Sequence, residues 1–282
     1  FALFMGVAMS ITAFPVLARI LEDRGLTKTF LGGTAITAAA VGDVTAWTIL
    51  AFVVALVKAG GMGSAAMTCA LAGVFLALMF FAVQPRLNAW LAARPRMAAN
   101  PNRGVMVGIL LLVFSCALFT EVIGIHALFG AFVAGLVMPE QPQFRHQLKE
   151  RLENFSSAFL LPLFFAFTGL RTQIGLLDDG ESWLICGVLI LLATVGKLGG
   201  TMTTARLTGM DWHDSFALGA LMNTRGLVEL IVLSIGLDLG ILPPRIFAMM
   251  VLMALVTTFM TGPLLSLGGY LRRRSPALAA TT

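Results

Sequence analysis

An apolar run of the chain is interrupted by polar and charged residues at Leu221-Met222-Asn223-Thr224-Arg225-Gly226-Leu227-Val228-Glu229-Leu230-Ile231-Val232-Leu233. The span around it, residues 214–236, is long enough to cross a bilayer, which takes roughly 20 predominantly apolar residues. Backbone that leaves the helix at membrane depth is tolerated only where it lines a cavity or is buried in protein. The stretch therefore predicts a broken transmembrane helix, with Asn223 and Gly226 at the break.

A second break is predicted in the first span, at Ser10-Ile11-Thr12-Ala13-Phe14-Pro15. Pro15 has no backbone N–H to donate and frees a carbonyl one turn back. The two interrupted spans are the first and the eighth, so they cross the membrane in opposite directions, and an apolar span follows each of them. Such pairs of broken helices, meeting at the midplane of an inverted repeat, form the ion sites of secondary transporters. We therefore expect an inverted-repeat fold with two broken helices.

The remainder of the chain is equally apolar. Hydrophobic residues make up 58% of it and charged residues 12%, and the mean hydropathy is +0.92. A soluble domain carries about twice that charge. We expect an all-α integral membrane protein in which residues 1–282 form a single transmembrane transporter domain. Nine spans are predicted, at residues 2–21, 31–57, 65–84, 104–121, 124–138, 155–175, 183–205, 214–236 and 246–270.

The charges of the loops orient these spans. One alternate set of loops, with the C-terminus, carries 14 Lys and Arg, whereas the opposite set carries three: Lys58, Arg171 and Arg245. Because Lys and Arg are in excess in cytoplasmic loops, we expect an inner-membrane protein with a cytoplasmic C-terminus. The two sets alternate only if residues 104–138 cross the membrane twice. The net charge of +5 lies at the ends of apolar runs rather than on a soluble face, so no nucleic-acid partner is expected.

The ends of the chain suggest a fragment. The sequence opens at Phe1 inside an apolar run, without the basic segment that begins a signal peptide. We therefore expect the first helices of the fold to be missing. At the other end the chain stops soon after the basic cluster Arg272–Arg274, so no soluble regulatory domain is expected.

Four ionisable residues lie well inside predicted spans: Asp43, Lys197, Arg225 and Glu229. Each costs at least ~2.5 kcal/mol near the bilayer centre unless it is paired or hydrated. Asp43 follows small residues that let neighbouring backbones approach, and its own helix offers no partner. A lone mid-membrane carboxylate suits the binding of a proton or a small cation; the alternative is a protonated Asp43 that hydrogen-bonds a neighbour.

The other three charges admit two interpretations each. Lys197, midway along the seventh span, is either linked to transport or a structural counter-ion, for example to Asp43. Arg225 and Glu229 are four residues apart, so they can pair on one helix face. That pair is either an internal lock, meaning an ion pair that only stabilises the fold, or part of the wall of the site.

At these residues the sequence resembles the monovalent cation:proton antiporter superfamily, in the branch that holds plant cation/H+ exchangers and bacterial Kef-type systems. The resemblance is carried by residues 10–21, by residues 160–170 and most specifically by residues 221–233. It implies alternating access by an inverted-repeat fold with a core domain and a dimer domain, and hence a homodimer. It implies no cofactor, only the transported Na+ or K+ and H+.

The same resemblance assigns the site residues. Asp43 matches the second, cation-binding position of the family's Asp-Asp or Asn-Asp pair, and Thr12 lies in the broken helix as a further cation or proton ligand. The first position of the pair is Gly42 in this chain, which departs from both versions. In the Asp-Asp members a lysine like Lys197 pairs with the first Asp, so its partner here is an open question.

Three alternative functions remain. A Kef-type K+ efflux system with channel-like behaviour needs an open pore and no obligatory proton. An intramembrane aspartyl protease, faintly suggested by Gly42-Asp43, needs two mid-membrane aspartates that share a proton, and the spans hold one, so an enzyme is not expected. A purely structural subunit is disfavoured by the cost of four buried charges. The sequence does not choose between Na+, K+ and Li+.

Overall fold

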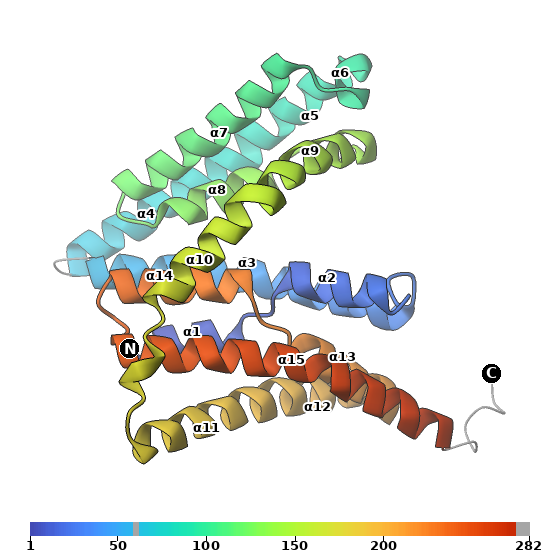
Figure 1. Cartoon of the computed structure of the whole chain (residues 1–282). Coiled ribbons are helices and arrows are strands. Elements are labelled where there is room, and N and C mark those ends of the chain that lie inside the picture. The colour runs from blue at the N-terminus through green and yellow to red at the C-terminus, as the bar shows by residue number, and fades with distance from the viewer. Residues whose placement is uncertain (59–61, 275–282) are drawn as a thin grey trace. The chain divides into compact units, whose positions relative to one another are not determined.

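The computed structural model describes residues 1–58 and 62–274, which contain helices and no strand (Figure 1). In chain order the elements are α1 (Ala2–Ser10), α2 (Phe14–Asp23), α3 (Phe30–Lys58), α4 (Met62–Leu78), η1 (Met79–Val83), α5 (Gln84–Ala92), α6 (Pro95–Ala99), α7 (Arg103–Val122), α8 (Ala127–Leu136), α9 (Pro142–Phe155), η2 (Ser156–Leu160), α10 (Leu161–Arg171), η3 (Ile174–Leu176), α11 (Gly180–Thr194), η4 (Val195–Gly199), α12 (Gly200–Leu207), α13 (Trp212–Met222), α14 (Leu227–Asp238) and α15 (Pro244–Arg274). Of the η elements, η1, η2 and η4 are π-helical turns and η3 is a 3-10 turn.

Eight of the predicted spans fall on long apolar helices. Among the described residues, seven helices are long and apolar enough to cross a membrane, and α13 with α14 forms an eighth candidate that is bent by 44° at its break. The chain is therefore an all-α, multi-pass membrane protein. The predicted span 124–138 contains only α8, a helix of 10 residues, which covers about 15 Å of a hydrocarbon core ~30 Å thick. A ninth crossing stays a prediction.

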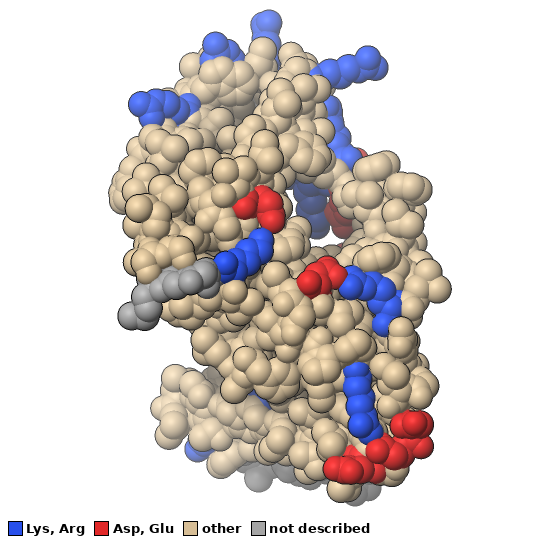
Figure 2. Space-filling view, turned by 90° about the vertical axis from the view of Figure 1, so that its left-hand side faces the viewer, with Lys and Arg blue, Asp and Glu red and all other residues tan. Residues whose placement is uncertain are grey.

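The chain divides into two compact units. The first unit comprises residues Phe1–Ala46 and Thr168–Thr282, and the second unit comprises Trp47–Phe167. On the face drawn in Figure 2, most of the surface is neither acidic nor basic. A surface of this kind suits contact with lipid better than contact with water.

In the second unit, α7 and α8 form a helical hairpin. They approach closely at Gly130, where a Cβ atom would lie 2.1 Å from the backbone oxygen of Cys116. At the turn, Glu121 pairs with Lys58 at 3.1 Å and accepts a hydrogen bond from the backbone N–H of Ala127 at 2.9 Å. The hairpin therefore reverses the direction of the chain at the turn after α7.

The opposite end of the second unit holds two basic loops. Arg151 of α9 donates hydrogen bonds to the backbone oxygen of Pro101 and to the side-chain oxygen of Asn100, the latter at 2.7 Å. Residues 85–103 and 139–154 thus lie side by side. The excess of Lys and Arg predicted that these two loops share one side of the membrane.

In the first unit, α11, η4 and α12 form one continuous helix, Gly180–Leu207. The π-helical turn η4 lies within it and contains Lys197. Helix α13 packs directly on this turn, because a Cβ atom at Gly219 would lie 2.7 Å from the backbone oxygen of Leu198. The close approach fixes Lys197 beside the break that follows α13.

Two ion pairs connect the end of α10 and the loop before α11 to the end of α14 and the start of α15. They join Arg171 with Asp238, and Arg245 with Asp179. Asp179 also caps α11 by accepting a hydrogen bond from the backbone N–H of Ser182 at 2.9 Å. The hydrogen bond from Arg245 and those from Ser182 hold the pKa of Asp179 well below its usual range. These loops are exposed, so the pairs contribute order more than stability.

Candidate functional site

The two predicted breaks meet in the first unit. Residues 11–13 separate α1 from α2, and residues 223–226 separate α13 from α14. The backbone N–H of Ala13 donates to the backbone oxygen of Thr224 at 3.0 Å. The Thr12 hydroxyl donates to the backbone oxygen of Met222 at 3.0 Å, across 210 residues of sequence. Backbone groups left free by one break thus serve as partners for the other.

Helix α15 supplies hydrogen-bond partners to the residues of the second break. The Thr258 hydroxyl accepts from the backbone N–H of Arg225 at 2.8 Å and donates to the backbone oxygen of the same residue at 2.7 Å. The side-chain amide of Asn223 donates to the backbone oxygen of Thr257 at 3.4 Å. Asn223 is fully buried, and its side-chain oxygen has no hydrogen-bond partner among the described residues. A buried oxygen without a donor is available to a cation or a water molecule.

Lys197 reaches the first break. Its ammonium donates to the Thr12 hydroxyl oxygen, with 2.6 Å between Nζ and Oγ1. Thr12 itself is 2% exposed. The π-helical turn that carries Lys197 is a distortion that often marks functional sites. The sequence left the partner of this lysine open, with Asp43 as one candidate, and the structure gives it the hydroxyl of Thr12.

Lys197 also lines two cavities. One, of about 360 Å³, is bounded by Met9 and Ser10 at the end of α1 and by α11. The other, of about 510 Å³, is bounded by Thr34 and Ala38 of α3 and by α12 and α13. Only Gly196 and Lys197 line both. The ammonium group and its hydrogen bond to Thr12 therefore lie where the two cavities come closest.

Asp43 lies near the middle of α3 and is half-buried. One of its carboxylate oxygens, Oδ1, is shielded from solvent and has no hydrogen-bond partner among the described residues. It forms no ion pair within 4.0 Å there. At the neighbouring Gly42, a Cβ atom would meet nothing within 4 Å. Oδ1 thus lacks a hydrogen-bond partner from the described part of the protein.

Arg225 and Glu229 pair as their spacing predicts. The two side chains are 2.8 Å apart, and each is 0% exposed. The guanidinium also donates to the backbone oxygen of Met9 at 2.8 Å, which is one of the carbonyls left free at the end of α1. Arg225 therefore connects the second break to the first, a geometry that favours the lock over the site wall.

The other predicted break residues lie at helix starts. Pro15 is the second residue of α2, where its missing N–H costs no helical hydrogen bond. Gly226 directly precedes α14 with an extended backbone, at φ 165°. Sequence reasoning missed Thr257 and Thr258, although two adjacent hydroxyls inside an apolar span were a signal that could have identified them.

The family model for the transmembrane sodium/hydrogen exchanger matches residues 1–267. The chain is 43% identical over 265 residues to the Na(+)/H(+) antiporter NhaS4 of Synechocystis, covering 94% of this chain and 64% of that protein. It is 45% identical over 266 residues to Cation/H(+) antiporter 17 of Arabidopsis thaliana, covering 94% of this chain and 32% of that protein.

A yeast protein is similar over the same region. K(+)/H(+) antiporter 1 of Saccharomyces cerevisiae is 37% identical over 269 residues, which cover 95% of this chain and 31% of that protein. The chain thus spans less than two thirds of the first of these relatives and about a third of the other two.

Proposed function

Because this chain belongs to the transmembrane sodium/hydrogen exchanger family, we propose that it exchanges a monovalent cation, Na+ or K+, for H+ as part of a secondary active transporter. The observation that carries the proposal is the meeting of two broken helices beside Lys197, with the unpaired carboxylate of Asp43 on a neighbouring helix. Broken helices of this kind supply backbone and side-chain oxygens to a transported cation.

In this proposal Asp43 is the shared binding group. A carboxylate holds either a proton or a cation, and this competition couples the two flows. The Thr12 hydroxyl offers a second oxygen. The ammonium of Lys197 donates to that hydroxyl at 2.6 Å, so in this proposal an arriving cation competes with it. The two cavities that share Lys197 support alternating access, in which one side is open at a time.

The assembly is part of the proposal. We propose a homodimer in the inner membrane with a cytoplasmic C-terminus, on the basis of loop charge and family resemblance. The relatives are named as Na+/H+, cation/H+ and K+/H+ antiporters, which favours a transporter over the protease. A channel-like K+ efflux system is the second candidate, and the transport assay separates it from an antiporter.

The expected result in vesicles that carry the protein and an imposed inside-acid pH gradient is cation-driven proton efflux. Addition of K+ or Na+ relieves the quenching of a pH-sensitive dye, because each entering cation displaces a proton. A channel gives this response only when a protonophore provides the proton path. Dequenching that requires the protonophore would therefore assign the channel, and no response to either cation would reject both.

Lys197→Met is expected to lower the melting temperature and shift the pH profile of exchange. A hydrogen bond from a charged group contributes about 1.5–3 kcal/mol, and Thr12→Val removes the same contact from the other side with little change of shape. The pair is expected to be non-additive in a double-mutant cycle. Only Lys197→Met removes a titrating group. An unchanged pH profile in this variant would limit Lys197 to a structural role.

A further inference from the structure

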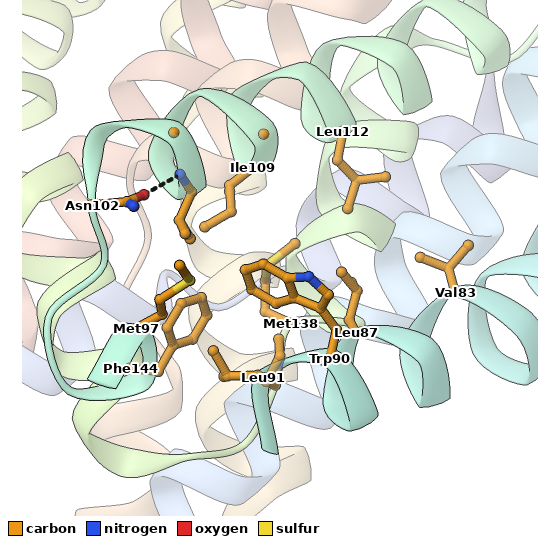
Figure 3. Close-up of a pocket in the computed structure, with 14 residues that line it drawn as sticks. Val83, Leu87, Trp90, Leu91, Met97, Asn102, Ile109, Leu112, Met138 and Phe144 are labelled. Atoms are coloured by element: carbon orange, nitrogen blue, oxygen red, sulfur yellow. Dashed lines mark hydrogen bonds between the residues drawn. The ribbon is translucent and has the colours of Figure 1, made fainter. Parts of the chain in front are cut away.

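The second unit contains a cavity that the proposed transport cycle does not use. It has a volume of about 520 Å³, within the range of ~300–1,000 Å³ typical of ligand sites. Trp90 of α5, Ile109 of α7 and Phe144 of α9 are among its lining residues (Figure 3). Apart from the indole N–H of Trp90, the polar side-chain group of the lining is the amide of Asn102, whose oxygen accepts from the backbone N–H of Val105 at 2.9 Å. The cavity therefore accepts apolar groups.

The rim of this cavity is cationic. The guanidinium of Arg94 lies over the ring of Trp90, at 4.8 Å from its centre. Arg145 donates to the backbone oxygens of Pro139 and Met138, which are wall residues, at 3.0 and 3.3 Å. Arg103 lies between the wall residues Asn102 and Gly104.

Few acidic groups oppose these cations. Arg96 is next to the wall residue Met97 in the sequence. Glu140, next to Pro139, is the acidic residue beside the wall in sequence. The ligand that fits is apolar at one end and anionic at the other.

We propose that this cavity binds an anionic phospholipid, with an acyl chain between α5, α7 and α9 and the headgroup phosphate on the arginines of the rim. The loops 85–103 and 139–154 form this end of the unit, and loop charge assigns it to the cytoplasmic side. Anionic lipids give that leaflet a negative surface potential, and basic pockets between helices on this side are typical headgroup sites. A neutral lipid gains nothing from the arginines, so the site selects for headgroup charge.

The test uses Trp90 as a reporter in a variant with Trp47, Trp183 and Trp212 replaced by Phe. The protein is reconstituted in phosphatidylcholine with a small fraction of one brominated lipid, either phosphatidylglycerol or phosphatidylcholine, because bromine quenches a tryptophan that it contacts. Brominated phosphatidylglycerol is expected to quench Trp90 more strongly than brominated phosphatidylcholine at the same fraction. Replacing Arg94 and Arg103 by Gln is expected to lower this preference by roughly fivefold for each arginine.

A cavity-filling variant separates the site from ordinary lipid contact. A Cβ atom at the wall residue Gly108 would meet nothing within 4 Å, so Gly108→Phe fills the cavity without a clash at its base. Gly73→Phe is the matched control, because Gly73 is equally open but lies outside the cavity. The preference is expected to disappear in the first variant and persist in the second.

Three outcomes would overturn the proposal. Equal quenching by both lipids would show contact with bulk lipid only. No quenching by either would show that protein, such as a second copy of the chain, covers the cavity. A preference that survives Gly108→Phe would place the lipid elsewhere.

Discussion

Asp43→Asn is expected to reduce cation-driven proton efflux to the level of vesicles without the protein, while the protein still folds. Asparagine keeps the shape of the side chain but neither exchanges a proton nor balances the charge of a bound cation. Asp43 makes no ion pair within 4.0 Å among the described residues, and its Oδ1 has no hydrogen-bond partner there. We therefore expect folding to survive loss of the charge.

The matched control is Asp178→Asn, which removes an exposed carboxylate in the loop before α11. Exchange in this variant is expected to equal that of the unmodified protein. Melting temperature and yield report on folding in both variants. Substantial cation-dependent proton flux in well-folded Asp43→Asn would refute Asp43 as the shared binding group.

The breaks were predictable from the sequence because their cause is local. Pro15 removes a backbone donor, and the polar run Asn223–Gly226 interrupts an apolar span. The inversion between the two spans rests on counting nine spans along the chain, and it stays a prediction. Their meeting is confirmed by the bonds from Ala13 to Thr224 and from Thr12 to Met222. The spacing of Arg225 and Glu229 likewise anticipated their pairing, because both lie on one helix.

The partner of Lys197 was not predictable, because it depends on tertiary contacts. The family pattern offered a carboxylate at position 42, and Gly42 removes it. The π-helical turn that holds Lys197 arises where α13 packs against the backbone of Leu198 through Gly219. No residue type in Val195–Gly199 signals such a turn on its own. Composition locates the spans, whereas contacts between them decide what each buried charge faces.

Arg225→Met and Glu229→Gln are each expected to destabilise the protein by about 3–5 kcal/mol, which is the cost of leaving one buried charge without its partner. The pair is fully buried, with 2.8 Å between Nη1 and Oε1. Bilayer or protein then surrounds the remaining charge in place of water, so it gains no compensating hydration. Denaturant unfolding in detergent measures the loss, and low yield of folded protein is the expected sign in cells.

The double variant Arg225→Met/Glu229→Met distinguishes a lock from two separate roles. Removing both charges leaves none unpaired, so its cost is expected to be smaller than the sum of the single costs. It is not expected to restore full stability, because the hydrogen bond from Arg225 to the backbone oxygen of Met9 is also lost. That bond joins the two breaks, and its loss leaves a carbonyl at the end of α1 unsatisfied.

The control is Arg19→Met, which breaks a pair of the same spacing with Asp23 on α2. Those side chains are 71% and 58% exposed, at 3.2 Å, so the loss is expected to stay within ~0.5 kcal/mol. Equal losses from the exposed and the buried pair, or single costs that add up in the double variant, would contradict the lock. The buried pair would then be part of the site wall, and its removal would alter exchange before it altered folding.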